Sequence, residues 1–149
     1  VIYLGNLSLY AFINSSGTGT DVAVLIGFIT CAALIAFLIF NSVPAKIFPG
    51  DSLTYLLGGV LVSMAIIGNM EMAALIVSIP FFFEFVLKLR GRLKKQSYGT
   101  YENGKVKSFY NKIYSIPHFM TITGKYTEKQ VVIFVYFIEI LFCILIWLI

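Results

Sequence analysis

A short polar segment between two apolar stretches holds residue types that can bind a metal and a phosphate group. It runs from Asn41 to Asp51 and reads N-S-V-P-A-K-I-F-P-G-D. Asp51 lies where the next helix should begin, and its carboxylate has two compatible interpretations. It could cap that helix by accepting hydrogen bonds from first-turn amides. It could also bind Mg²⁺, which proteins usually hold through one or two carboxylates together with substrate phosphates.

A second polar segment supplies clustered positive charge. Residues 90–95 read R-G-R-L-K-K, and the cations in this run are Arg90, Arg92, Lys94 and Lys95. A polybasic run beside a membrane span usually sets the topology or contacts anionic lipids. Guanidinium groups also bind phosphate oxygens through paired hydrogen bonds, so the run is at the same time a candidate clamp for a diphosphate. Both interpretations apply to these residues as a group.

Composition indicates what kind of protein positions these segments. Hydrophobic residues make up 59% of the 149 residues and charged residues 12%, against about 45–50% and about 25% in soluble domains. The mean hydropathy of +0.91 excludes a soluble or a disordered chain. Cys31 and Cys143 lie inside apolar runs, where we expect helix packing and no disulfide scaffold. The chain is therefore predicted to be a membrane protein.

Apolar stretches account for most of the chain. A helix needs about 20 mostly apolar residues to cross a bilayer, and about 17 at the least. The stretches that reach or approach this length are Val22–Phe40, Leu53–Gly68, Met72–Leu89 and Val131–Ile149. Val1–Ile13 is too short, and we expect it to be the second half of a helix that begins upstream. The predicted fold is all-α, a polytopic transmembrane bundle of four full spans and one partial N-terminal span.

Polar residues mark the expected helix starts. Asp21 precedes the second apolar stretch, Asp51 or Ser52 the third, and Asn69 the fourth, each with a side chain able to cap first-turn amides. Residues 127–130, Thr-Glu-Lys-Gln, have the spacing of a capping box before the last stretch. These signals predict helix boundaries close to the ends of the apolar stretches.

The basic residues are distributed unevenly among the loops. All 11 lie in or beside residues 41–52 and 90–130, and none lies in the other two connections. The positive-inside rule places those two loops in the cytoplasm and the C-terminal Ile149 outside. The net charge of +4 then reflects topology and a local anion site, with membrane lipids as partners and no nucleic acid.

The loop at residues 90–130 is too long to be a passive connector. Its Tyr-rich arms flank Asn103-Gly104, the preferred pair for a type I′ turn, so a small β-hairpin is predicted there. His118, the single histidine, is expected to be structural or interfacial. Glu84 and Glu139 lie within apolar runs and should face the bundle interior or water. Their roles stay open.

The segment from Asn41 to Asp51 also resembles a known signature. Written N-x-x-P-A-K-x-F-x-G-D, it is similar to the cytoplasmic signature of the polyprenyl-phosphate N-acetylhexosamine-1-phosphate transferases, or glycosyltransferase family 4. The resemblance covers nearly the whole chain and implies the C-terminal half of a membrane-embedded transferase. The bacterial muramoyl-pentapeptide branch has a His-rich motif that this chain lacks. The chain therefore looks closest to the archaeal and eukaryotic UDP-GlcNAc:dolichyl-phosphate branch.

This resemblance implies a reaction. Members transfer N-acetylglucosamine-1-phosphate, or a similar sugar phosphate, from a UDP-N-acetylhexosamine to polyprenyl or dolichyl phosphate and release UMP. The reaction begins the assembly of lipid-linked glycans on the cytoplasmic face of a membrane, the plasma membrane in a prokaryote or the endoplasmic reticulum in a eukaryote. Homodimers are common in the superfamily.

The resemblance also implies roles for single residues. Asp51 matches a catalytic Mg²⁺ ligand, with Mn²⁺ as a substitute, and Phe48 matches a residue that stacks on uracil. The family places basic residues for the diphosphate in the loop that holds Arg90, Arg92, Lys94 and Lys95. Phe48 could instead anchor the loop at the membrane interface, and Lys46 could reach either a phosphate or a lipid headgroup.

Two other classes of protein would also account for part of the sequence. A non-catalytic helical membrane subunit explains the helices and the charge asymmetry. A small transporter needs polar groups facing one another at mid-membrane, and Glu139 alone supports it. The family's Asp-Asp motif lies on earlier loops, so this chain of 149 residues is expected to be inactive by itself.

Overall fold

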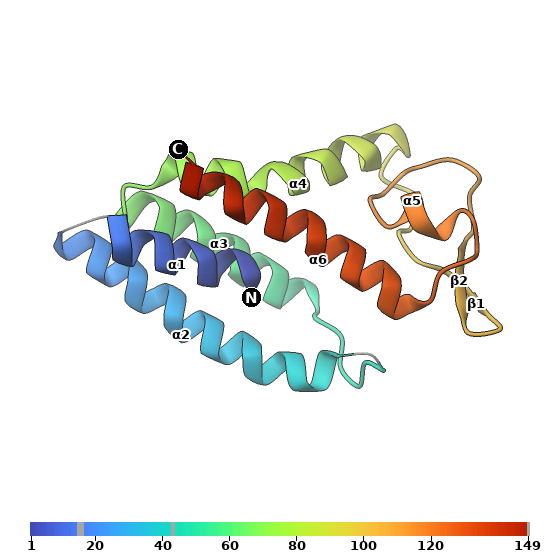
Figure 1. Ribbon diagram of the computed structural model, residues 1–149, viewed down its shortest axis with the longest axis horizontal. Helices are drawn as coiled ribbons and strands as arrows, with labels where there is room; N and C mark the ends of the chain where they lie inside the picture. Colours follow the sequence, from blue (N-terminus) through green and yellow to red (C-terminus); the bar gives the residue numbers. More distant parts are fainter. Residues whose placement is uncertain (15–16, 43, 149) are drawn as a thin grey trace. The chain divides into compact units, whose positions relative to one another are not determined.

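The computed structural model describes residues 1–14, 17–42 and 44–148, and most of them are helical (Figure 1). The helices are α1 (Ile2–Asn14), α2 (Thr18–Asn41), α3 (Asp51–Ile67), α4 (Glu71–Arg90), α5 (His118–Thr121) and α6 (Glu128–Leu145), and a 3₁₀ turn at Ile146–Leu148 follows α6. The strands are β1 (Gly99–Glu102) and β2 (Lys105–Ser108). Residues 15, 16, 43 and 149, which fall in the predicted connections and at the end of the predicted last span, lie outside the described residues.

Three helices among the described residues have the length and composition to cross a membrane. They are α2, α4, and α6 with its 3₁₀ extension, and their mean hydropathies are 2.9, 2.0 and 2.9. Helix α3 is apolar but has only 17 residues, the lower limit for a span. The protein is therefore an integral membrane protein, and three of the predicted four full spans have the required length.

Several helix starts differ from the prediction. Helix α2 begins at Thr18, so Asp21 lies inside its first turn, where the Asp21 amide donates to the Gly17 carbonyl at 3.1 Å. Helix α4 begins at Glu71, and Asn69, with φ of 50°, lies in the turn that follows α3. The residue in the capping position of α2 is Gly17, and no side chain caps this helix start. Asp21 still complements the positive N-terminal end of its helix.

The predicted capping box before the last helix is confirmed. The Thr127 amide donates to Oε1 of Gln130 at 2.9 Å, and the Gln130 amide donates to Oγ1 of Thr127 at 3.4 Å. Helix α6 begins between these residues, at Glu128. The reciprocal pair satisfies two exposed donors and so specifies the boundary locally.

The chain forms two compact units, the first made of Val1–Val77 and Phe142–Ile149. Its core relies on small residues. A β-carbon at Gly27 of α2 would lie 1.9 Å from Oγ of Ser8 and 2.5 Å from Cε of Met64, so α1, α2 and α3 approach closely at this glycine. Such contacts are typical of helices packed in membranes. Cys31 and Cys143 are buried in this core, as predicted.

The second unit spans Ser78–Leu141 and holds the predicted hairpin. Strands β1 and β2 pair antiparallel, with Glu102 opposite Lys105. Asn103 and Gly104 have φ of 50° and 78°, so both turn residues take the positive values that a type I′ turn requires. The amide of Val106 donates to the carbonyl of Tyr126 at 2.9 Å and ties the hairpin to the segment before α6 (Figure 1).

Candidate functional site

The loop between α2 and α3 folds back on the end of α2. The side-chain amide of Asn41 donates to the Ile47 carbonyl at 2.7 Å, and the Lys46 backbone amide donates to the Phe40 carbonyl at 2.8 Å. These bonds hold the backbone of the loop against the end of α2. Lys46 is exposed, and Phe48 has 77% of its surface exposed. An apolar ring kept so open is available to a ligand or to the membrane interface.

Asp51 is the first residue of α3, and the residue in the capping position is Gly50. The Leu53 and Thr54 amides donate to the Gly50 carbonyl at 3.2 and 3.3 Å. The capping interpretation of Asp51 or Ser52 is therefore wrong, because Gly50 takes that position and its carbonyl accepts these amides. Among the described residues the exposed Asp51 carboxylate has no hydrogen bond or ion pair, which leaves it available to a ligand.

Asp51 can supply one part of a metal site. No group of three or more His, Cys, Asp or Glu side chains in the described part of the chain could hold a metal ion. Mg²⁺ needs only one or two protein carboxylates, because water and substrate phosphates complete its octahedral shell. The exposed carboxylate thus fits one ligand position of a Mg²⁺ site whose other ligands come from elsewhere.

The basic turn, which we define as residues 90–95, closes the end of α4. Arg92 and Leu93 have φ of 53° and 56°, so two consecutive residues with β-carbons take the left-handed conformation. Their amides donate to the Leu89 and Lys88 carbonyls at 2.8 and 2.9 Å. This conformation is uncommon outside glycine, so surrounding contacts must hold the turn.

The cations of the basic turn fall into two groups. Arg90, Arg92 and Lys94 are exposed, and no acidic partner of theirs occurs among the residues that the structure describes. Lys95 is half-buried, with its ammonium group 4.5 Å from the ring centre of Tyr110 and 6.0 Å from that of Tyr114. Aromatic faces attract a cation at these distances. Lys95 is thus held on rings, whereas the other cations face solvent.

Glu84 of α4, whose role the sequence left open, faces the long loop. Its carboxylate accepts from the Ser115 hydroxyl at 2.8 Å and from the Ile116 amide at 2.7 Å. The Lys88 ammonium group lies 3.9 Å from the same carboxylate. Lys88 lies four positions after Glu84, a spacing that the sequence itself shows. Ser115 and Ile116 are more than 30 positions away, and nothing in the sequence indicates them as partners.

His118 is fully buried at the start of α5. Its Nδ1 accepts from the Tyr114 amide at 3.1 Å, and the rings of Tyr110 and Tyr114 lie 5.9 and 6.5 Å from its own. Burial lowers the pKa of His118 and the positive charge of Lys88 adds to this effect, while the backbone of Gln96 and the negative charge of Glu84 act in the opposite direction. These contacts support the structural interpretation of this histidine.

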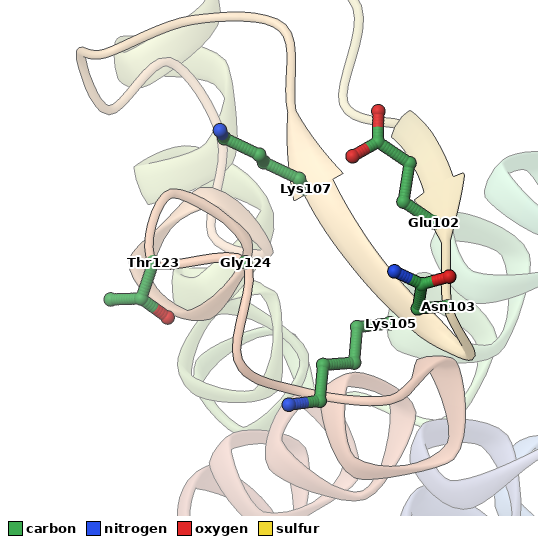
Figure 2. A pocket seen from close by; sticks show the side chains of 6 residues that line it. All are labelled: Glu102, Asn103, Lys105, Lys107, Thr123 and Gly124. Carbon is green, nitrogen blue, oxygen red and sulfur yellow. The ribbon is translucent and has the colours of Figure 1, made fainter.

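A polar pocket of about 360 Å³ lies between the hairpin and the turn after α5. Figure 2 shows its lining residues, Glu102, Asn103, Lys105, Lys107, Thr123 and Gly124. Gly124 has φ of +63°, and a β-carbon there would lie 3.3 Å from the Lys107 side chain. Of these residues the sequence indicated only Asn103, and that for the hairpin turn, although lysines two positions apart on a strand share one face of it.

Residues 1–69 match the model of glycosyl transferase family 4. A protein of Saccharolobus solfataricus, named as a candidate UDP-N-acetylglucosamine–dolichyl-phosphate N-acetylglucosaminephosphotransferase, is 39% identical over 140 residues, which is 93% of this chain and 44% of the relative. A Sulfolobus acidocaldarius protein with the same name is 38% identical, over 91% of this chain and 42% of the relative.

A phospho-N-acetylmuramoyl-pentapeptide-transferase of Thermotoga petrophila is 37% identical over 67 residues, which is 45% of this chain and 21% of the relative. This match covers a smaller part of the chain than the two archaeal matches. No solved structure matches the chain. The chain spans less than half the length of these curated relatives.

Proposed function

We propose, from the premise that residues 1–69 are a glycosyl transferase family 4 segment, that the protein carrying this chain transfers a sugar-1-phosphate between two carriers. The donor is a UDP-N-acetylhexosamine, with UDP-N-acetylglucosamine as the first choice. The acceptor is polyprenyl or dolichyl phosphate in the membrane, and UMP is released. The observation that carries the proposal is the match to the archaeal dolichyl-phosphate relative across 93% of the chain.

Asp51 is the residue we assign to Mg²⁺, or to Mn²⁺ in its place. The support is its exposed carboxylate, which has no hydrogen bond or ion pair within the described residues and lies in the segment that matches family 4. The metal supplies charge stabilisation for a pyrophosphate that is being cleaved. Asp51 acts by holding that charge in place, and positioning of this kind is the main contribution of the protein to phosphoryl transfer.

Phe48 and Lys46 are the residues of the same loop that we assign to the nucleotide. Stacking of a base on an aromatic face contributes about 1–3 kcal/mol. The 77% exposure of Phe48 leaves its ring open to the uracil. Lys46, two positions before it and exposed, supplies a point charge for a phosphate of the donor.

Arg90, Arg92 and Lys94 are the cations we assign to the diphosphate. Their exposure, together with the lack of an acidic partner among the described residues, supports the assignment. Arginine suits this task because its planar fork binds two phosphate oxygens at once. Lys95 belongs to the same basic turn, and its ammonium group is held on the ring of Tyr110.

In this proposal the loops at residues 41–52 and 90–130 lie on the cytoplasmic side, and the acceptor reaches them from the membrane. The acceptor phosphate attacks the sugar-linked phosphorus of the donor, a bond to that phosphorus forms, and the bond to UMP breaks. The chain's part is to hold both phosphate groups in line, which lowers the barrier by orientation and charge.

The test is the change of Asp51 to Asn in the full-length protein, with UMP release measured in the presence of UDP-GlcNAc, Mg²⁺ and polyprenyl phosphate. We expect turnover to fall about 100-fold or more, as for other losses of transition-state charge stabilisation. Asp21→Asn is the matched control, because Asp21 also lies in the first turn of an apolar helix. Unchanged turnover in a folded Asp51→Asn protein would remove Asp51 from the mechanism.

A further inference from the structure

We infer that Glu84 is a positioning residue that clamps the long loop against α4 and so holds the backbone of the basic turn. The inference rests on the proposed function, in which Arg90, Arg92 and Lys94 bind the donor diphosphate. Glu84 itself touches no substrate in this scheme. It acts through the shape of the turn that presents those cations.

The first contact of the clamp joins Glu84 to the far part of the long loop. Its carboxylate accepts from the Ser115 hydroxyl at 2.8 Å and from the Ile116 amide at 2.7 Å. Ser115 is fully buried, so its hydroxyl has no access to water as a replacement partner. Loss of the carboxylate would leave the buried Ser115 hydroxyl without this acceptor, and an unsatisfied buried donor costs more than the hydrogen bond itself.

The second contact joins the same carboxylate to the near part of the loop through Lys88, one helical turn further along α4. The Lys88 ammonium group lies 3.9 Å from Glu84 and donates to the Lys95 carbonyl at 3.1 Å. It also donates to the Ser97 hydroxyl, which in turn lies 3.5 Å from Oε1 of Glu84. One ion pair therefore holds residues 95–97 and residues 115–116 to the same stretch of helix.

This arrangement closes the basic turn at both ends. Arg90 belongs to α4, and the carbonyl of Lys95 is held by Lys88 of the same helix. The residues between them include Arg92 and Leu93, with φ values of 53° and 56°. Residues that carry a β-carbon adopt such positive values only when surrounding contacts hold them there. The packing of Lys95 on Tyr110 adds a third restraint. The clamp thus imposes the conformation in which Arg92 is exposed.

Glu84→Gln and Ser115→Ala in the full-length protein test the clamp separately from the reaction. Glu84→Gln places an amide group beside the Ile116 donor, and Ser115→Ala keeps the charge and removes one hydroxyl. We expect peptides that cover residues 91–97 and 113–117 to exchange amide hydrogens about tenfold faster in both variants, with α2 unchanged. Glu139→Gln, the same chemical change in α6, is the matched control and should leave both segments as they are.

Steady-state kinetics test the positioning role. We expect the KM for UDP-GlcNAc to rise about tenfold in Glu84→Gln and to rise less in Ser115→Ala, with kcat changed by a smaller factor. A purely structural defect would lower the amount of active protein and leave KM unchanged. Ser115→Ala also serves if Glu84→Gln fails to accumulate in the membrane, because it removes only one contact.

Each result decides a defined part of the inference. Exchange rates equal to those of Glu139→Gln would overturn the clamp. Faster exchange with an unchanged KM would overturn the positioning role and leave Glu84 a structural residue. If the unmodified full-length protein transfers no sugar phosphate, the proposed function and the positioning role both fail, whereas the exchange rates still show whether the clamp exists.

Discussion

The backbone amide of Tyr114 donates a hydrogen bond to Nδ1 of His118 at 3.1 Å. Nδ1 must be unprotonated to accept this bond, so the buried imidazole is neutral and carries its hydrogen on Nε2. Nε2 has no hydrogen-bond partner among the described residues. Protonation would add a charge to a buried ring. It would also turn Nδ1 from an acceptor into a donor, so the hydrogen bond from the Tyr114 amide would be lost. The fold of the long loop therefore depends on the protonation state of His118.

Stability should decrease in mild acid because of this histidine. Burial lowers the pKa of His118 below its ordinary value of 6.5, so the unfolded chain takes up the proton first as the pH falls. The free energy of unfolding is then highest above about pH 6.5 and decreases below it. Thermal unfolding of the detergent-solubilised protein at about pH 7.5 and about pH 5 measures the loss. His118→Gln, which cannot titrate, should lose less, and equal losses in both proteins would contradict the prediction.

Replacing Phe48 by Leu should weaken donor binding with little effect on stability. The ring is 77% exposed, so its removal opens no cavity. Loss of about 1–3 kcal/mol of stacking corresponds to a rise of roughly 5- to 150-fold in the KM for UDP-GlcNAc. Tyr55→Leu is the control, because Tyr55 is 78% exposed on α3. A Phe48→Leu protein with an unchanged KM would favour the role of an interfacial anchor.

Arg92→Gln should weaken binding of the donor more than does the same loss of charge at a cation outside the basic turn. Arg92 is exposed and has no acidic partner in the described part of the chain, so its charge is available to a diphosphate. We expect the KM for UDP-GlcNAc to rise about tenfold and to depend less steeply on salt. Lys112→Gln, another exposed cation of the same loop, is the comparison. Equal effects of the two changes would indicate nonspecific attraction to the membrane or the donor.

Gly27→Ala should destabilise the packing of α1, α2 and α3. The added β-carbon would lie 1.9 Å from Oγ of Ser8 and 2.5 Å from Cε of Met64. Overpacking of this kind costs about 1–3 kcal/mol, which lowers the thermal midpoint in detergent. Gly58→Ala in α3 is a matched control, since nothing lies within 4 Å of the position its β-carbon would take. A midpoint as high as that of the control would show that the three helices separate easily at this point.

Removal of divalent cations should abolish transfer in the full-length protein. The chain supplies one exposed carboxylate, Asp51, and the described residues include no complete cluster of metal-ligating side chains. The ion should therefore be exchangeable, and added Mg²⁺ or Mn²⁺ should restore UMP release after chelation. Full turnover in excess chelator would argue against a bound divalent cation in the reaction.

Local interactions are what the sequence predicted well. The Thr127–Gln130 capping box and the Asn103-Gly104 turn use partners within three positions, so their residue types suffice to specify the geometry. The helix starts at Asp21 and Asn69 were predicted less well. Helix α2 begins three residues before Asp21, and Asn69 lies in the turn that follows α3. The residue types alone do not distinguish a capping position from a place in the first turn or in the preceding turn.

The sequence by itself determined the apolar spans, the segregation of positive charge and the segment around Asp51, because hydropathy, net charge and short motifs are properties of neighbouring residues. Only the tertiary structure decided that Glu84 meets Ser115, that Lys95 lies on Tyr110 and that His118 is buried. The physical reason is that each of these states depends on chain segments brought together by folding. A carboxylate, an ammonium group or an imidazole has many acceptable partners, and packing selects among them.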